Sequence, residues 1–136
     1  MQKEQVKAFK NELRNYTFYC SRIVSLGNSI EFCYDRLGGV RGIDPSKEPV
    51  HAMPNKEMEY KLRDEIERYE ATLKRYKEKV DSIDEILERI ELPIREAVIT
   101  VYVNGNQLVK VARDYYLSPT GLQKRINRAI EKAIPL

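Results

Sequence analysis

Residues 62–90 have the sequence LRDEIERYEATLKRYKEKVDSIDEILERI, which predicts one long helix. Its apolar residues recur at alternating intervals of four and three, which is typical of a helix with a single apolar seam. Acid-before-base pairs four residues apart, such as Asp64 with Arg68, indicate that the rest of the helix surface is solvated. The seam positions are Leu62, Ile66, Tyr69, Leu73, Tyr76, Val80, Ile83, Leu87 and Ile90.

The N-terminal part of the chain carries a second seam with the same period, which predicts one long helix over residues 3–37. Gly38-Gly39 favours a helix end, and residues 38–54, which contain three prolines, predict a loop. Asn55 is the expected N-cap of the following helix, which we expect to end near Leu92-Pro93. Two seams of matching length predict a long antiparallel helical hairpin over residues 1–91. The first seam consists of Val6, Phe9, Leu13, Tyr16, Cys20, Ile23, Gly27, Ile30, Tyr34 and Leu37.

Three aromatic residues, Phe18, Tyr19 and Phe32, lie beside the first seam and widen its apolar face. A second apolar face on one helix favours contact with another helix, so we expect a homo-oligomer, with a dimer favoured. The alternative is that these side chains pack within a single hairpin.

The last third of the chain has a different pattern, which predicts three short helices with tight connections. The expected helices cover about residues 93–103, about residues 107–115, and the segment that begins at Ser118; the first turn is Asn104-Gly105-Asn106. Ser118 followed by Pro119 is a strong helix start, with an N-cap serine and proline at the first helical position. The inward face of the last helix is expected to consist of Leu122, Ile126, Ala129, Ile130 and Ala133. The predicted fold is therefore all-α: a helical hairpin followed by a small three-helix domain over residues 92–136.

Positive charge is concentrated in that last segment. Residues 92–136 hold seven basic and three acidic side chains, whereas the other 91 residues hold 17 basic and 18 acidic ones. Such an asymmetry is typical of a module that binds a polyanion. A basic last helix behind a short turn predicts a helix-turn-helix, in which the second helix enters the major groove of duplex DNA.

The outward residues of the last helix are the candidate DNA-binding residues. Early positions of a recognition helix reach base edges, so Thr120, Gln123 and Lys124 are expected to read bases, with Asn127 beside them. Arg125, Arg128 and Lys132 are expected to contact phosphates. The alternative is a three-helix bundle whose basic face is simply solvated.

The segments LPIREAVI (92–99), LVKVA (108–112) and LSPTGLQKRINRAI (117–130) resemble the fourth conserved region of bacterial sigma factors. They are closer still to phage-encoded late-transcription regulators of the ArpU type. The resemblance covers about a third of the chain. It implies binding to promoter DNA and control of late genes. Pro119 and Gly121 depart from the pattern, because sigma factors usually carry charged, base-reading side chains at these places.

The expected function is a phage or prophage DNA-binding transcriptional regulator that uses its hairpin to dimerise or to contact RNA polymerase. Two alternatives remain open: a DNA-packaging protein similar to a small terminase subunit, and a coiled-coil adaptor for other proteins. Oligomer size separates the first from the regulator, and salt-dependent DNA binding separates the adaptor from both.

Other classes of protein are disfavoured by the residues themselves. Cys20 and Cys33 form no CxxC pair, and a single histidine, His51, leaves no zinc motif. No nucleophile–base pair or phosphate loop occurs, so we expect neither an enzyme nor a bound cofactor or metal. No apolar run is long enough to span a bilayer, and the N-terminus lacks the apolar core of a signal peptide. The expected location is the cytoplasm, with no membrane partner.

Overall fold

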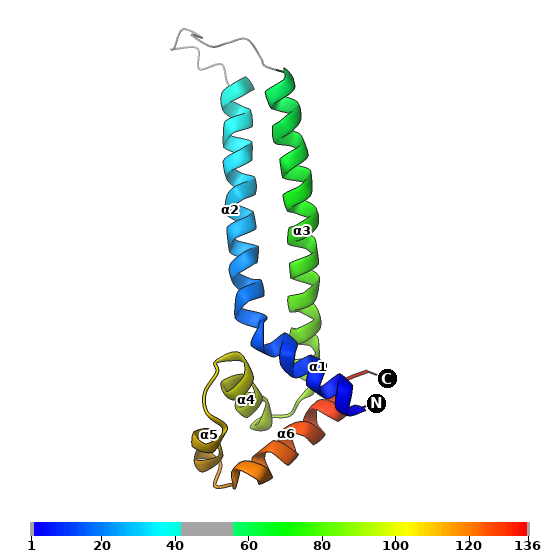
Figure 1. The fold of residues 1–136 in the computed structure, drawn as a ribbon, viewed down its shortest axis with the longest axis vertical. Helices are drawn as coiled ribbons and strands as arrows, with labels where there is room; N and C mark the ends of the chain where they lie inside the picture. The colour runs from blue at the N-terminus through cyan, green and yellow to red at the C-terminus, as the bar shows by residue number, and fades with distance from the viewer. Residues whose placement is uncertain (1, 42–55, 136) are drawn as a thin grey trace. The chain divides into compact units, whose positions relative to one another are not determined.

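The computed structural model describes residues 2–41 and 56–135. Every regular element in these ranges is a helix, so the predicted all-α class is confirmed (Figure 1). Each of these helices is too short or too polar to cross a lipid bilayer. The elements are α1 (Gln2–Arg14), α2 (Tyr16–Arg41), α3 (Lys56–Arg89), α4 (Ile94–Val98), the π-helical turn η1 (Ile99–Val103), α5 (Leu108–Asp114) and α6 (Pro119–Ala133).

The chain divides into two compact units, which we call the terminal unit and the central unit. The terminal unit consists of Met1–Cys20 together with Glu78–Leu136, and the central unit is Ser21–Lys77. This division differs from the predicted boundary at residue 92, because α1 packs against η1 and α6. The side chains on the inner face of α1, Val6, Phe9 and Leu13, are all buried. An apolar helix face must be covered, and the C-terminal helices cover this one.

The central unit is held together by an apolar cluster between α2 and α3. The helices run antiparallel, because Arg22 lies over the ring of Tyr76 at 5.9 Å while the hydroxyl of Tyr34 donates to Glu70 at 3.3 Å. The residue number therefore rises along one helix as it falls along the other. The cluster consists of Cys33, Leu37, Leu62 and Ile66, with Ile30 and Tyr69 packed against it.

The structure corrects the seam predicted for the first segment. Tyr34, placed in the seam, is 52% exposed, whereas Leu26 and Cys33 are each only 3% exposed. The observed row keeps the predicted Ile30 and Leu37, but Leu26 and Cys33 replace Gly27 and Tyr34, so only alternate seam positions move by one residue. Both rows have the same period, but the observed row buries a leucine in place of Gly27 and leaves the polar end of Tyr34 accessible, which is the more favourable choice.

The first segment is also not one helix. It breaks at Asn15, whose backbone N–H is shared between the carbonyls of Asn11 at 3.2 Å and Glu12 at 3.1 Å. At its other end, α2 continues through Gly38 and Gly39 to Arg41, so the predicted helix end at these glycines is wrong. Glycine weakens a helix by about 1 kcal/mol relative to alanine, which does not prevent a packed helix from continuing.

The rest of the predicted loop over residues 38–54, with His51 and the predicted N-cap Asn55, lies outside the described residues. All nine predicted seam positions of the second segment, eight in α3 and Ile90 directly after it, are buried or half-buried. The three aromatic residues beside the first seam separate: Tyr19 is buried, whereas Phe18 and Phe32 are 54% and 60% exposed. Tyr19 donates to Glu12 at 2.8 Å, so it belongs to the packing of the terminal unit.

The terminal unit contains the most completely buried side chains among the described residues. The largest side chains that are fully buried all belong to it, and they come from α1, the end of α3, α4 and α6. Burial of one such side chain contributes about 1.5–3 kcal/mol, so this small unit has a well-defined core. These side chains are Leu13, Ile90, Val98, Leu122, Ile126 and Ile130.

Candidate nucleic-acid interface

The start of α6 is fixed by a serine cap, as the sequence predicts. Ser118 has an extended backbone, and its hydroxyl oxygen accepts a hydrogen bond from the backbone N–H of Gly121 at 3.0 Å. Pro119 occupies the first turn, where no backbone donor is needed. A Cβ atom at Gly121 would lie 3.0 Å from the Ser118 hydroxyl, so glycine leaves room for the cap.

The connection between α5 and α6 is a tight turn. Tyr116 has a φ of 56°, in the left-handed region, and the backbone N–H of Leu117 donates to the carbonyl of Ala112 at 2.9 Å. This bond closes the C-terminal end of α5. Val111 and Ala112 of α5 are buried, and α5 contacts α6. The two helices are therefore held against each other across the turn.

Tyr115 fastens the end of α5 to the start of α4. Its hydroxyl donates to the carbonyl of Pro93 at 3.2 Å. Burial raises the pKa of Tyr115, and the nearby carboxylates of Glu96 and Asp114 raise it further. The phenol therefore stays protonated, and the donor is retained at neutral pH.

The structure distributes the seven candidate residues unequally over α6. One face of the helix is buried, through Leu122, Ile126, Ile130 and Ala133. Asn127 is only half-exposed, and its side-chain oxygen accepts a hydrogen bond from the ammonium group of Lys10 on α1. The other six candidates are exposed: Thr120, Gln123, Lys124, Arg125, Arg128 and Lys132.

Three of these cations line a cleft between α6 and the end of α3. The cleft has a volume of about 310 Å³. Arg89, at its edge, donates to the backbone carbonyl of Ala133 at 3.2 Å, which fixes the guanidinium beside the end of α6. The lining residues are Arg89, Ile90, Glu91, Ile94, Arg125, Arg128, Ala129 and Lys132. Four of these eight residues are basic and one is acidic, so the cleft suits a negatively charged group.

Lys124 lies between the two flanks of α6. At about 100° per residue, it is about 60° around the helix axis from Asn127 and about 40° from Arg128. Its side chain is exposed and does not line the cleft. Thr120, Gln123 and Lys124 are therefore the exposed candidates closest to the helix start, and Lys124 points almost directly away from the buried face.

Arg95 is one of the seven basic residues in segment 92–136, but its role differs from that of the exposed cations of α6. Its guanidinium donates to the backbone carbonyl of Ile90 at 2.9 Å and to that of Glu88 at 3.0 Å. It thereby satisfies carbonyl groups at the end of α3 that have no partner within the helix. Arg95 is a capping residue of the terminal unit and adds little to the outward charge of α6.

The contribution of α1 was not predicted from the sequence. Lys10 lies over the ring of Tyr102 at 5.2 Å, and Arg14 lies over the same ring at 5.5 Å. Both are within the range of cation–π contacts. The signal was present in the sequence, because Lys3, Lys7, Lys10 and Arg14 recur at intervals of four, three and four.

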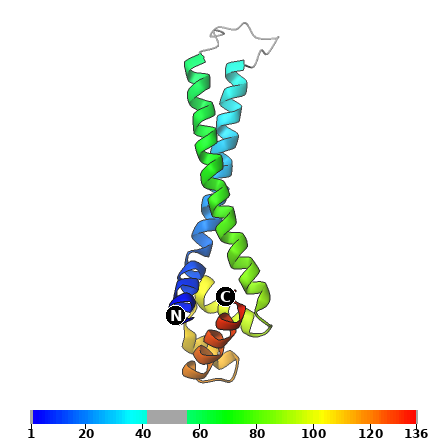
Figure 2. The ribbon, with the colours of Figure 1, turned by 90° about the vertical axis from the view of Figure 1, so that its right-hand side faces the viewer.

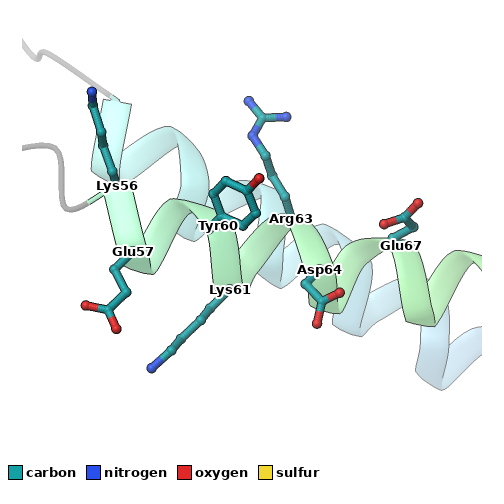
Figure 3. A pocket seen from close by; sticks show the side chains of 7 residues that line it. All are labelled: Lys56, Glu57, Tyr60, Lys61, Arg63, Asp64 and Glu67. Atoms are coloured by element: carbon teal, nitrogen blue, oxygen red, sulfur yellow. The ribbon is translucent and has the colours of Figure 1, made fainter.

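A larger hollow, of about 650 Å³, lies along the first turns of α3 in the central unit. Figure 3 shows that its lining side chains extend in different directions from a single helix. All of the described lining residues belong to α3, and their charges are mixed. The lining residues are Lys56, Glu57, Tyr60, Lys61, Arg63, Asp64 and Glu67. The side chains of this hollow do not converge on one point. The cleft on α6, in contrast, brings together basic side chains from two elements.

Comparison with protein-family models, curated proteins and solved structures finds no match to this chain. Over residues 2–41 and 56–135, no group of three or more His, Cys, Asp or Glu side chains is arranged to hold a metal ion.

Proposed function

We propose that this protein binds double-stranded DNA through α6 and acts as a transcriptional regulator. The observation that carries the proposal is the division of α6 into two faces. One face is buried within the terminal unit, and the exposed side chains that follow Pro119 at the capped N-terminus are all polar or charged. A helix that is held by a second helix across a tight turn is what a helix-turn-helix presents to the major groove.

The positions of the side chains on α6 suggest separate roles. Thr120, Gln123 and Lys124 lie in the N-terminal half, which enters the groove first, and we assign base contacts to them. Arg125, Arg128 and Lys132 lie on the flank that lines the cleft, and we assign phosphate contacts to these three. Asn127 is bonded to Lys10, so we assign it a positioning role for α1 in place of a base contact.

The resemblance to ArpU-type regulators and to sigma factors motivates the biological part of the proposal. We propose that the DNA sites belong to late genes of a phage or prophage. The central unit provides the surface for self-association or for RNA polymerase. In support of a second partner, Val24 and Phe32 on α2 are 63% and 60% exposed although they are apolar.

The test is a titration of a labelled duplex of mixed sequence with the full-length protein, followed by fluorescence anisotropy at several salt concentrations. We expect a double variant, Lys124→Gln with Arg128→Gln, to bind much more weakly and with a shallower salt dependence. The matched control is Lys74→Gln with Lys77→Gln, which removes the same charge from exposed positions on α3. An equal loss of DNA affinity in both double variants would mean that the effect comes from net charge alone. No binding by the wild-type protein would favour a protein adaptor.

Light scattering of the same preparations measures the oligomer. A dimer supports a regulator that binds paired half-sites. A large ring would instead favour a DNA-packaging component.

A further inference from the structure

The basic residues of α1 form a single stripe. Lys3, Lys7, Lys10 and Arg14 lie within about 60° of one another around the helix axis, as follows from 3.6 residues per turn. The two acidic residues of α1 lie elsewhere: Glu4 is about 90° from the middle of the stripe, and Glu12, on the far side, accepts the hydrogen bond from Tyr19. We call these four residues the α1 stripe.

The α1 stripe is anchored next to the outward face of α6. Lys10 donates to Asn127, and both Lys10 and Arg14 lie over the ring of Tyr102 in η1. These contacts fix where the stripe lies relative to α6, since all the residues belong to the terminal unit. Lys3 and Lys7 are exposed and continue the stripe toward the N-terminus.

The stripe and the cleft lie on opposite flanks of α6. Asn127, which meets the stripe, is about 130° around the helix axis from the middle of the row formed by Arg125, Arg128 and Lys132. In Figure 2, α6 (orange to red) has α1 (blue) on one side and the end of α3 (green) on the other. Lys124 lies between the two cationic flanks.

A major groove is about 12 Å wide and is bounded by one phosphate backbone on each side. A helix in the groove therefore has phosphates along both of its flanks. We infer that the α1 stripe binds the phosphates of one DNA strand, while Arg125, Arg128 and Lys132 bind those of the other. The N-terminal helix is then part of the DNA interface, although it is separated from α6 by more than 100 residues of sequence.

This inference rests on the proposed function, and the two are tested with the same assay. The variant is Lys3→Gln with Lys7→Gln in the full-length chain. Both side chains are exposed, so the fold is expected to be retained, and circular dichroism and the thermal midpoint check this. Each lost phosphate contact lowers the slope of log affinity against log salt by about 1, so we expect a decrease of about 2. Selected and random duplexes are expected to lose affinity in parallel.

The control is again Lys74→Gln with Lys77→Gln. If the variant in Lys3 and Lys7 retains the wild-type affinity and salt slope while the variant in Lys124 and Arg128 loses affinity, α1 is not in the interface and the proposed function stands. If neither variant changes affinity, both the inference and the proposed function are wrong.

A second measurement tests the assignment to opposite strands. An iron chelate is attached to the cysteine introduced by Lys7→Cys or by Lys132→Cys, in a background that carries Cys20→Ala and Cys33→Ala. Each protein is bound to a duplex selected from a random pool, and backbone cleavage is mapped on both strands. We expect the two positions to cleave different strands across the same groove. Cleavage of one strand from both positions would overturn the inference.

Discussion

Lys10 of α1 donates a hydrogen bond to Asn127 of α6, although the two residues are 117 positions apart in the sequence. The contact is partly buried and connects the first helix of the chain to the last. Because one partner carries a charge, it belongs to the stronger class of hydrogen bonds.

A double-mutant cycle measures this contact. We expect Lys10→Met and Asn127→Ala each to lower the free energy of unfolding, with a coupling of about 1 kcal/mol between them. The measurement is urea unfolding of the wild type, both single variants and the double variant. The control cycle pairs Lys10→Met with Gln123→Ala, because Gln123 is exposed and the two effects are expected to add. Additivity in the Lys10–Asn127 cycle as well would mean that the contact contributes nothing to stability.

Lys124 and Arg128 are expected to have different roles in DNA binding. Lys124→Ala should reduce the preference for a selected site over random DNA by roughly 1–3 kcal/mol, as the loss of a base contact does. Arg128→Ala should weaken binding to both duplexes in parallel and lower the salt slope by about 1. Titration of both variants against both duplexes distinguishes these outcomes. If neither substitution affects either duplex, α6 does not lie in the groove.

The cap at Ser118 is expected to stabilise α6. Ser118→Ala removes the acceptor for the backbone N–H of Gly121, and we expect a loss of about 1 kcal/mol in the free energy of unfolding. Ser118→Gly should lower the free energy of unfolding by only about a few tenths of a kcal/mol, because glycine is itself tolerated at an N-cap. The control is Ser82→Ala, at an exposed position within α3. Equal effects at the two serines would contradict a capping role.

Charged substitutions in the α3 seam are expected to destabilise the protein. Leu73→Asp and Val80→Asp each place a carboxylate at a half-buried seam position, and we expect each to lower the free energy of unfolding by more than about 2 kcal/mol. Lys77→Asp, at an exposed position of the same helix, should have a much smaller effect. Thermal denaturation and sedimentation velocity measure stability and oligomer size. An unchanged midpoint and an unchanged oligomer would exclude these residues from a seam.

Tyr115 is expected to make the free energy of unfolding decrease as the pH rises into the alkaline range. Because its pKa is raised in the folded state, the unfolded chain loses the phenolic proton first as the pH rises above about 10. The stabilisation is therefore complete below pH 10 and decreases as the pH rises through the folded-state pKa. Urea unfolding between pH 8 and 11 should show a steeper decrease for the wild type than for Tyr115→Phe. Parallel curves would mean that Tyr115 has the same pKa in both states.

Local spacing in the sequence was sufficient to predict the seam of α3 and the start of α6. The alternation of four and three over Leu62–Ile90 predicted a seam whose positions are all buried or half-buried, because period and burial are linked in any helix that packs along one side. Ser118 and Pro119 predicted the start of α6 for a similar reason, since a cap involves only the three or four residues that follow it. The turn at Gly105, which has a φ of 74°, is equally local.

Tertiary packing decided the features for which two local solutions were nearly equivalent. The row through Leu26 and the row through Gly27 have the same period, and only the partner helix selects the one that buries more apolar surface. The same holds for the functional side chains. Arg95 and Asn127 look like surface residues in the sequence, but contacts with α3 and α1 give them structural partners. Such contacts join distant parts of the chain, and their energies depend on packing that helical periodicity does not encode.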